Sequence, residues 1–242
     1  MSVRDMASKL DHSLSYKKVS FKNAGHFCRK KSILNLIHSF NLNPEGTYFD
    51  VGCSNGYLTR LITDEIGFKK VVGLDHAESH LERARLENPA IIFDFIDLNL
   101  VPRSGCREGS ADFVTCFECL EHVGSVNNAI KNIVSLSKEK SVIFVSVPIE
   151  IGFWGVIKFL CKTIIFQYRL DELAGKPRWS EYFFDLIKGA RISKYRELRQ
   201  GWSTHFGFDY REVDEEFLKL GLKFKAFNSF TTRFYVIKRG QG

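Results

Sequence analysis

The chain has 242 residues, of which 44% are hydrophobic, 14% aromatic and 26% charged. This length and composition are typical of one globular domain, or of two small ones, and they exclude a disordered, collagen-like or disulfide-scaffold protein. The formal net charge of +7 favours an anionic substrate or surface without identifying one.

The amino-terminal residues contain no apolar run typical of a signal peptide, and no stretch of the sequence is long and apolar enough to predict a membrane-spanning helix. We therefore expect a cytoplasmic protein. Six cysteines are spread along the chain, and only Cys116 and Cys119 lie close together in sequence. This spacing lacks the second pair of a zinc knuckle, so buried, reduced thiols are expected.

Strand-like and helical segments alternate between residues 45 and 148, after an expected helical segment over residues 1–44. Gly67 is predicted to end the first helix of this alternation, Ser79 with Glu82 to cap the second, and Ser125 to begin the third. The alternation predicts a doubly wound α/β fold with a mostly parallel sheet. The expected strands are residues 47–51, 70–74, 91–96, 112–117 and 141–147.

The alternation stops at Pro148 and resumes near Asp209, so we expect a helical insertion after the fifth strand, over residues 149–208, that selects the substrate. Asp209 and Glu212 are predicted to cap a closing helix that ends at Gly221. Residues 222–227 and 232–238 then predict a β-hairpin, which completes a segment over residues 209–242. Residues 1–242 are therefore expected to form one domain around a seven-stranded sheet.

The most informative segment is the turn between the first strand and the first helix, Asp50-Val51-Gly52-Cys53-Ser54-Asn55-Gly56. Glycine at such a turn lets a ligand approach the backbone. A dinucleotide-binding G-x-G-x-x-G fingerprint counted from Gly52 would need glycine at positions 54 and 57, which are Ser54 and Tyr57. The acidic residues Asp50 and Asp75 instead suit a ligand with ribose hydroxyls.

These residues resemble the class I S-adenosylmethionine-dependent methyltransferases, and the resemblance covers residues 45–148. It implies a Rossmann-like fold and a D-x-G-x-G-x-G turn that holds the methionine and ribose parts of S-adenosylmethionine. Asp50, Gly52 and Gly56 match this turn, and Ser54 replaces its middle glycine. The product would be S-adenosylhomocysteine.

The resemblance also implies roles for residues after the next strands. Asp75 would bind the ribose hydroxyls, and Asp97 would accept a hydrogen bond from the adenine amino group while Leu98 packs on the ring. The remaining cofactor-binding candidates are Cys53, Ser54, His76 and Cys116.

Residues 111–123 resemble the DxVxxxEVLEHV stretch of the same family, which lies near the methyl donor. The N/D-P-P-Y run of enzymes that methylate planar amino groups is absent here, as are the Pro-Cys pair of cytosine-C5 methyltransferases and the cysteine triplet of radical enzymes. A hydroxyl acceptor benefits from a general base, and the catalytic candidates are His122, His205 and Glu118.

Glu118, Glu121 and His122 also resemble the metal-binding E-x-x-E-H run of small-RNA 2′-O-methyltransferases and ubiquinone-biosynthesis O-methyltransferases. Carboxylates and one imidazole suit magnesium, manganese or zinc. The same run also begins a helical turn in relatives that hold no metal, so we expect no divalent metal at this site.

Two patterns mark the insertion. Residues 151–166 are almost wholly apolar except for Lys158 and Lys162, which predicts an amphipathic helix that belongs to the core, covers a greasy acceptor, or contacts a membrane surface. Between residues 176 and 199 basic and aromatic residues recur, which suits a solvated helix face, or a site for an anionic lipid, a sugar phosphate or RNA.

Together the patterns predict an S-adenosylmethionine-dependent methyltransferase that acts on an oxygen atom of a small or lipid-linked metabolite. Two alternatives stay open. An RNA methyltransferase would bind RNA through the basic insertion, with a steep dependence on salt. A non-catalytic module would bind the cofactor without turnover.

Overall fold

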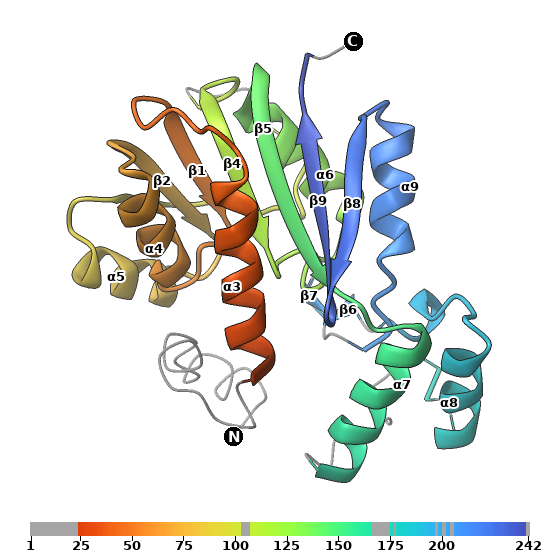
Figure 1. Ribbon diagram of the computed structural model, residues 1–242. Helices are drawn as coiled ribbons and strands as arrows, with labels where there is room; N and C mark the ends of the chain where they lie inside the picture. Colours follow the sequence, from red (N-terminus) through yellow and green to blue (C-terminus); the bar gives the residue numbers. More distant parts are fainter. Residues whose placement is uncertain are drawn as a thin grey trace.

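The computed structural model describes residues 24–102, 107–165, 175–176, 178–196, 198–199, 202–203 and 206–240 (Figure 1). A seven-stranded sheet of order β3-β2-β1-β4-β5-β9-β8 forms its centre. The first five of these strands are parallel, and β9 runs antiparallel to both β5 and β8. The strands are β1 (Thr47–Val51), β2 (Lys70–Asp75), β3 (Ile92–Phe95), β4 (Ala111–Phe117), β5 (Ser137–Pro148), β8 (Phe224–Ser229) and β9 (Thr232–Lys238).

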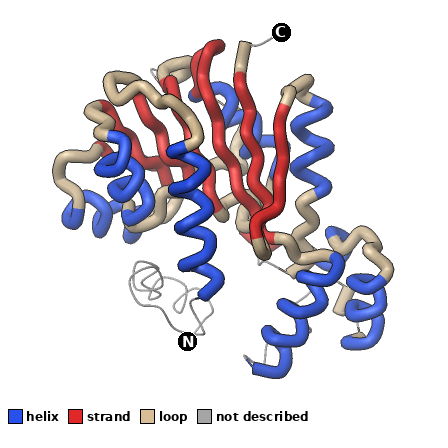
Figure 2. The backbone as a smooth tube through the Cα atoms, in the orientation of Figure 1, coloured by secondary structure: helices blue, strands red, loops and turns tan. Residues whose placement is uncertain are grey.

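Helices cover both faces of this sheet (Figure 2). On one face the buried side chains of the strands pack with Ile130 of α6 and Phe217 of α9. On the other face they pack with Ile33 of α3 and Ile62 of α4. The predicted doubly wound α/β fold with a mostly parallel sheet is therefore confirmed. The helices of these layers are α3 (Ala24–His38), α4 (Tyr57–Ile66), α5 (Glu78–Glu87), α6 (Val126–Leu136) and α9 (Arg211–Lys219).

The helix ends follow the local sequence in some places and not in others. Gly67 ends α4 with φ 82°, and the Ser125 hydroxyl accepts a hydrogen bond from the Asn128 N–H at 3.2 Å, as predicted. The predicted cap at Ser79 is wrong, because α5 already begins at Glu78 after Ala77. The predicted cap at Asp209 is confirmed, because Tyr210 already has helical φ and ψ angles and Asp209 Oδ1 accepts a hydrogen bond from the Arg211 N–H at 3.1 Å.

The insertion contains short elements around a small core of its own. The expected helix is present, but its last turn widens into a π-helix. None of the described helices is long and apolar enough to cross a bilayer. The elements are α7 (Gly152–Leu160), the π-helix η2 (Cys161–Ile165), α8 (Trp179–Ile187), the 3-10 helix η4 (Ser193–Tyr195), β6 (Leu198–Arg199) and β7 (Trp202–Ser203). The core is Ile151, Phe159, Tyr182, Leu186, Ile192, Tyr195 and Phe206.

Candidate active site

The strand order reverses between β1 and β4, and in open α/β sheets ligands bind in the crevice outside the carboxyl ends of the strands at such a point. The turn after β1 and the loop after β4 meet there. A Cβ atom added to Gly52 would lie 2.5 Å from Cys119 Sγ, and Gly52 has φ 78°. Only glycine fits this position, because any other residue would be strained at this positive φ and its side chain would clash with Cys119. A separate cavity of about 680 Å³ lies near the first residues of β5 and includes none of the candidate residues.

Asp50 lies at the base of the turn, and both of its carboxylate oxygens accept hydrogen bonds from buried threonines. The Thr59 hydroxyl donates to Oδ2 at 2.6 Å, and the Thr115 hydroxyl donates to Oδ1 at 2.7 Å. Tyr48 continues this series of hydrogen bonds, because its hydroxyl lies 2.8 Å from the Thr115 hydroxyl. Burial outweighs these two hydrogen bonds and raises the pKa of Asp50 from 3.8 to about 6.

Asp75, at the end of β2, holds the turn from the other side. Its Oδ2 accepts from the Ser54 N–H at 2.8 Å, and its Oδ1 accepts from the Ala77 N–H at 2.9 Å. His76 Nδ1 lies 3.4 Å from the same Oδ1. Burial alone would raise the pKa of Asp75, but the hydrogen bonds from His76, Ala77 and Ser54 outweigh it and hold the pKa below its usual value. Asp75 therefore carries a negative charge at neutral pH.

Ser54 stands where the family pattern has its middle glycine, and it keeps the backbone conformation that glycine favours there, with φ 49°. Below the turn, Gly56 and Gly73 make room for the ring of Phe93, since an added Cβ would lie 2.7 Å and 2.5 Å from its atoms. Cys53 packs in the same small cluster. Burial raises the pKa of the Cys53 thiol well above its usual value, so this cysteine stays a neutral, small side chain.

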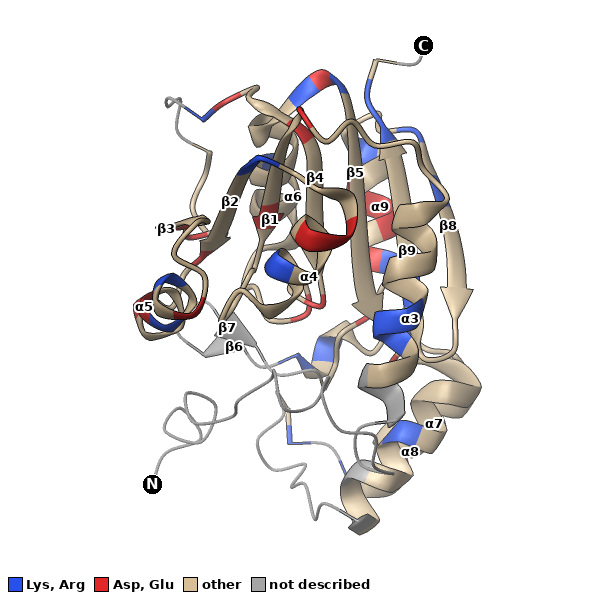
Figure 3. Ribbon diagram, turned by 60° about the vertical axis from the view of Figure 1, so that its left-hand side comes forward, with Lys and Arg blue, Asp and Glu red and all other residues tan. Residues whose placement is uncertain are grey.

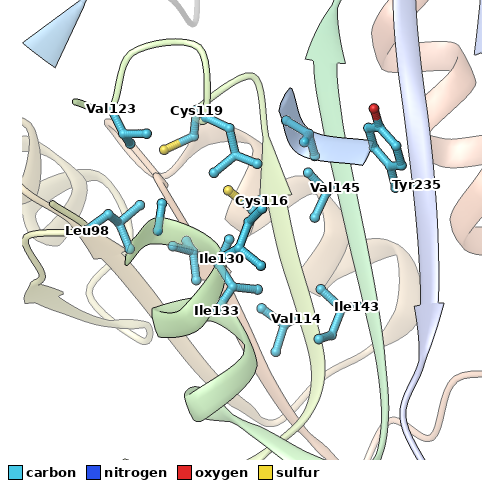
Figure 4. Close-up of a cluster of buried hydrophobic side chains, with 14 of the residues drawn as sticks. Leu98, Val114, Cys116, Cys119, Val123, Ile130, Ile133, Ile143, Val145 and Tyr235 are labelled. Atoms are coloured by element: carbon cyan, nitrogen blue, oxygen red, sulfur yellow. The ribbon is translucent and has the colours of Figure 1, made fainter. Parts of the chain in front are cut away.

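The loop after β3 places Asp97 and Leu98. Asp97 is half-buried and its Oδ1 accepts from the Asn99 N–H at 2.9 Å. Asn99 in turn accepts from the Gly124 and Ser125 N–H groups, which ties this loop to the start of α6. Leu98 lies among the buried side chains between the sheet and α6, as does Cys116 of β4 (Figure 4). Contact of these residues with adenine stays a prediction.

The loop after β4 begins with Glu118, whose φ is 51°. Its Oε2 lies 2.7 Å from Arg29 Nη2 of α3, and its Oε1 accepts from the Ser146 hydroxyl at 3.1 Å. The side chains of Arg29 and Glu118 are only 13% and 14% exposed. Helix α3 is further tied to the closing hairpin, because Arg29 Nε donates to Thr232 Oγ1 at 3.3 Å. The positive charge of the Arg29 guanidinium therefore balances the negative charge of the Glu118 carboxylate at the carboxyl ends of the strands.

Glu121 and His122 follow on the same loop. Glu121 is fully buried, and burial, with the nearby charge of Glu118, raises its pKa well above the usual range. His122 Nε2 lies 4.0 Å from Glu121 Oε1, and its side chain is 41% exposed. The described residues contain no group of three or more acidic, cysteine or histidine side chains arranged to hold a metal ion. His205 lies outside the described residues.

Arg196 of the insertion fixes this loop, whereas the sequence placed it only in the basic stretch over residues 176–199. Its Nη2 donates to the carbonyls of Leu120, Glu121 and Val123 at 3.3, 3.2 and 2.7 Å. Its Nη1 lies 3.3 Å from Glu212 Oε2, and its side chain is 7% exposed. The buried guanidinium thus connects the insertion to the loop that carries the catalytic candidates.

Comparison with known proteins agrees with this geometry. A family model described as a methyltransferase domain matches residues 25–213. The ubiquinone biosynthesis O-methyltransferase of Pseudomonas paraeruginosa is 30% identical over 169 residues, which are 69% of this chain and 66% of that protein. The enzyme of the same name from Vibrio campbellii is 32% identical over 40% of this chain and 41% of its own length. The chain thus matches just under two thirds of the first of these relatives and less of the second.

Solved structures share the fold at low sequence identity. Magnesium protoporphyrin IX methyltransferase from Synechocystis, solved with bound S-adenosylhomocysteine, aligns over 98% of this chain and 95% of its own, with a TM-score of 0.61 and 15% identity. The chain solved with the Trm112 methyltransferase activator of Haloferax volcanii aligns over 99% and 98%, with a TM-score of 0.63 and 14% identity. Because the family model covers most of the sequence and solved methyltransferases share the fold, the chain belongs to the methyltransferase-domain family of class I S-adenosylmethionine-dependent methyltransferases.

Proposed function

We propose that this protein transfers a methyl group from S-adenosylmethionine to an oxygen atom of a small or lipid-linked metabolite. The observation that carries the proposal is the meeting of the turn containing Gly52 and Gly56 with the ionised Asp75 at the carboxyl ends of β1 and β2, beside the point where the strand order reverses. The ubiquinone-biosynthesis relatives support oxygen as the acceptor atom.

The residues at these strand ends fit the proposed cofactor. A carboxylate has about four acceptor positions, and the Ser54 N–H, the Ala77 N–H and His76 occupy three of those on Asp75, so one position remains for a ribose hydroxyl. We assign Asp97 and Leu98 to the adenine and the backbone of residues 52–56 to the methionine portion. The cofactor supplies an electrophilic methyl group on a sulfonium. The chain must align the acceptor with that group and exclude water.

For a hydroxyl acceptor we assign the general base to His122, whose imidazole is partly exposed on the loop after β4. Glu118 is a less direct candidate, because Arg29 and Ser146 already engage its carboxylate. We assign it to positioning the acceptor together with Arg29. Residues 149–208, including His205, would select the acceptor.

An RNA substrate has less support. In the basic stretch of the insertion, Arg191, Lys194 and Arg196 are each engaged by an acidic residue of the protein, which leaves fewer cations for phosphates. If RNA were the acceptor, binding of a short RNA would weaken steeply as salt increases. Salt-insensitive or absent RNA binding argues against that alternative.

Calorimetry with S-adenosylhomocysteine tests the cofactor assignment. Asp75→Ala should weaken binding by about 1–3 kcal/mol, because a ribose hydroxyl loses a charged acceptor. Asp64→Ala is the matched control, since Asp64 is an exposed acid on α4 paired only with Arg60 among described residues. A wild-type chain that binds neither S-adenosylmethionine nor its product would refute the proposal, and an unchanged affinity in Asp75→Ala would remove Asp75 from the site.

The acceptor atom needs a second experiment. Methyl-labelled S-adenosylmethionine is incubated with the wild-type chain and a fractionated cell extract, and the labelled product is identified by mass spectrometry and NMR. A methoxy product supports the proposal. Label on nitrogen, carbon or RNA contradicts it, and His122→Ala should slow transfer of label without weakening binding of S-adenosylhomocysteine.

A further inference from the structure

Helix α7 and the π-helix after it expose an apolar stripe. Phe153 and Ile164 are 73% and 71% exposed at the two ends of the stripe. Ile157 and Leu160 lie between them at helical spacing, so the four side chains follow one face. The opposite face places Phe159, 2% exposed, in the core of the insertion. Because the core already covers one apolar face, the exposed stripe is additional to what folding of the insertion requires.

Neighbouring elements add exposed aromatic and aliphatic side chains. On α8, Phe184 and Ile187 are each 56% exposed and Trp179 is 45% exposed. At the tip of the β8–β9 hairpin, Phe230 is 55% exposed, and its ring lies 5.0 Å from that of Trp154 between centroids. Trp and Phe beside aliphatic side chains are typical of protein surfaces that enter the membrane interface.

The charges around these side chains are mostly positive. Helix α8 carries two acidic residues, Glu181, which is exposed, and Asp185, which pairs with Lys194. Helix α7 and η2 contain no acidic residue (Figure 3). Lys176 and Arg178 before α8 and Lys188 after it are exposed, and none of the three forms an ion pair with another described residue. Each such cation near an anionic bilayer contributes roughly 1 kcal/mol to binding. A second copy of the same surface would instead bring like charges together, which disfavours a symmetric dimer.

The surface also lies at the functional end of the molecule. Helices α7 and α8 project beyond the carboxyl ends of the parallel strands, the end at which the turn after β1 and the loop after β4 meet (Figures 1 and 2). Helix α7 follows β5 almost directly, so the surface is fixed to the sheet by a short connection.

We propose that the exposed apolar side chains of α7, η2, α8 and Phe230, together with Lys176, Arg178 and Lys188, dock this protein on an anionic lipid surface. Docking there would hold the carboxyl ends of the parallel strands close to the bilayer. This surface is separate from the cofactor site, so the inference goes beyond the proposed function and does not depend on it.

Vesicle co-sedimentation tests the docking surface. The full chain is mixed with vesicles made of phosphatidylglycerol and phosphatidylcholine in equal parts, or of phosphatidylcholine alone, at low and high salt. We expect binding to the anionic vesicles that falls as salt increases. The double variant Phe153→Ser/Ile164→Ser should lower the partition coefficient by about tenfold or more, because two exposed side chains would no longer enter the interface.

Matched controls separate the surface from general effects. Leu86→Ser/Leu218→Ser removes two apolar side chains of similar exposure, 83% and 67%, from α5 and α9, and should leave vesicle binding unchanged. Lys176→Gln/Arg178→Gln/Lys188→Gln should lower binding to anionic vesicles only. The matched charge control is Lys131→Gln/Lys140→Gln/Lys223→Gln, at exposed positions outside the insertion.

The inference would be overturned if the wild-type chain did not bind anionic vesicles, or if the test and control variants lost vesicle binding equally. It would also be overturned if analytical ultracentrifugation showed a dimer that Phe153→Ser/Ile164→Ser converts to monomer while the wild-type chain binds no vesicles. Calorimetry with S-adenosylhomocysteine on the same variants keeps the two proposals apart. The docking variants should bind this product like the wild-type chain.

Discussion

Replacing Asp50 by asparagine should change how the stability of the protein depends on pH. In the folded chain the pKa of Asp50 is about 6, against 3.8 in the absence of burial. A difference of roughly two pKa units corresponds to about 3 kcal/mol at about 1.4 kcal/mol per unit. Because the folded-state pKa is the higher one, the folded chain holds this proton more tightly than the unfolded chain does. The resulting stabilisation is complete below about pH 4 and is lost as the pH rises through about 6.

The asparagine of the variant does not titrate, while the other acids are the same in both chains. The free energy of unfolding of the wild-type chain minus that of Asp50→Asn should therefore fall by about 3 kcal/mol between about pH 4 and about pH 7. Urea unfolding followed by circular dichroism at several pH values measures both curves. Asp64→Asn, at an exposed position, is the control and should leave the pH profile close to that of the wild-type chain. If the profiles of wild type and Asp50→Asn run parallel, the burial argument for Asp50 is refuted.

Two further substitutions test contacts around the candidate active site by urea unfolding. Arg196→Met should lower the free energy of unfolding by about 2–4 kcal/mol, because three backbone carbonyls lose their buried donor. Arg191→Met is the control: it breaks an exposed pair with Glu215 and should lower the free energy of unfolding by less than about 1 kcal/mol. Equal losses in the two variants would contradict a stabilising role for the buried Arg196 guanidinium. Gly73→Ala should cost about 1–3 kcal/mol through its clash with Phe93, and adding Phe93→Leu should recover part of that loss. If the two losses of unfolding free energy are strictly additive in this double-mutant cycle, a side chain at position 73 does not clash with Phe93.

Local patterns predicted the sheet well, because each parallel strand is a nearly continuous apolar run between helices. The turn from Asp50 to Gly56 was also readable, since its residues are consecutive and its glycines adopt the positive φ values that the pattern implies. The limits of β5 were less accurate. It begins at Ser137, ahead of the predicted residue 141, in a stretch where Lys138 Nζ pairs with Asp112 at 2.7 Å. Charged residues at 138–140 hid this part of the strand.

Contacts between distant segments escaped prediction. Sequence alone treated Glu118 as a base or a metal ligand, and gave no sign that Arg29 of α3 would engage it. The two threonines that donate to Asp50 lie on different elements, α4 and β4, and match no motif. Each of these pairings depends on how layers pack, so only the assembled fold brings the partners together.

The grip of Arg196 on residues 120–123 has a practical consequence for protein engineering. The insertion could be exchanged with that of a relative in order to change substrate preference. Three backbone carbonyl oxygens would then lose their hydrogen-bond donor unless the incoming segment supplies one at the same place. A transplant that carries both segments as one cassette avoids this conflict. Natural diversification of the insertion faces the same restriction, so the two segments are expected to change together across orthologues.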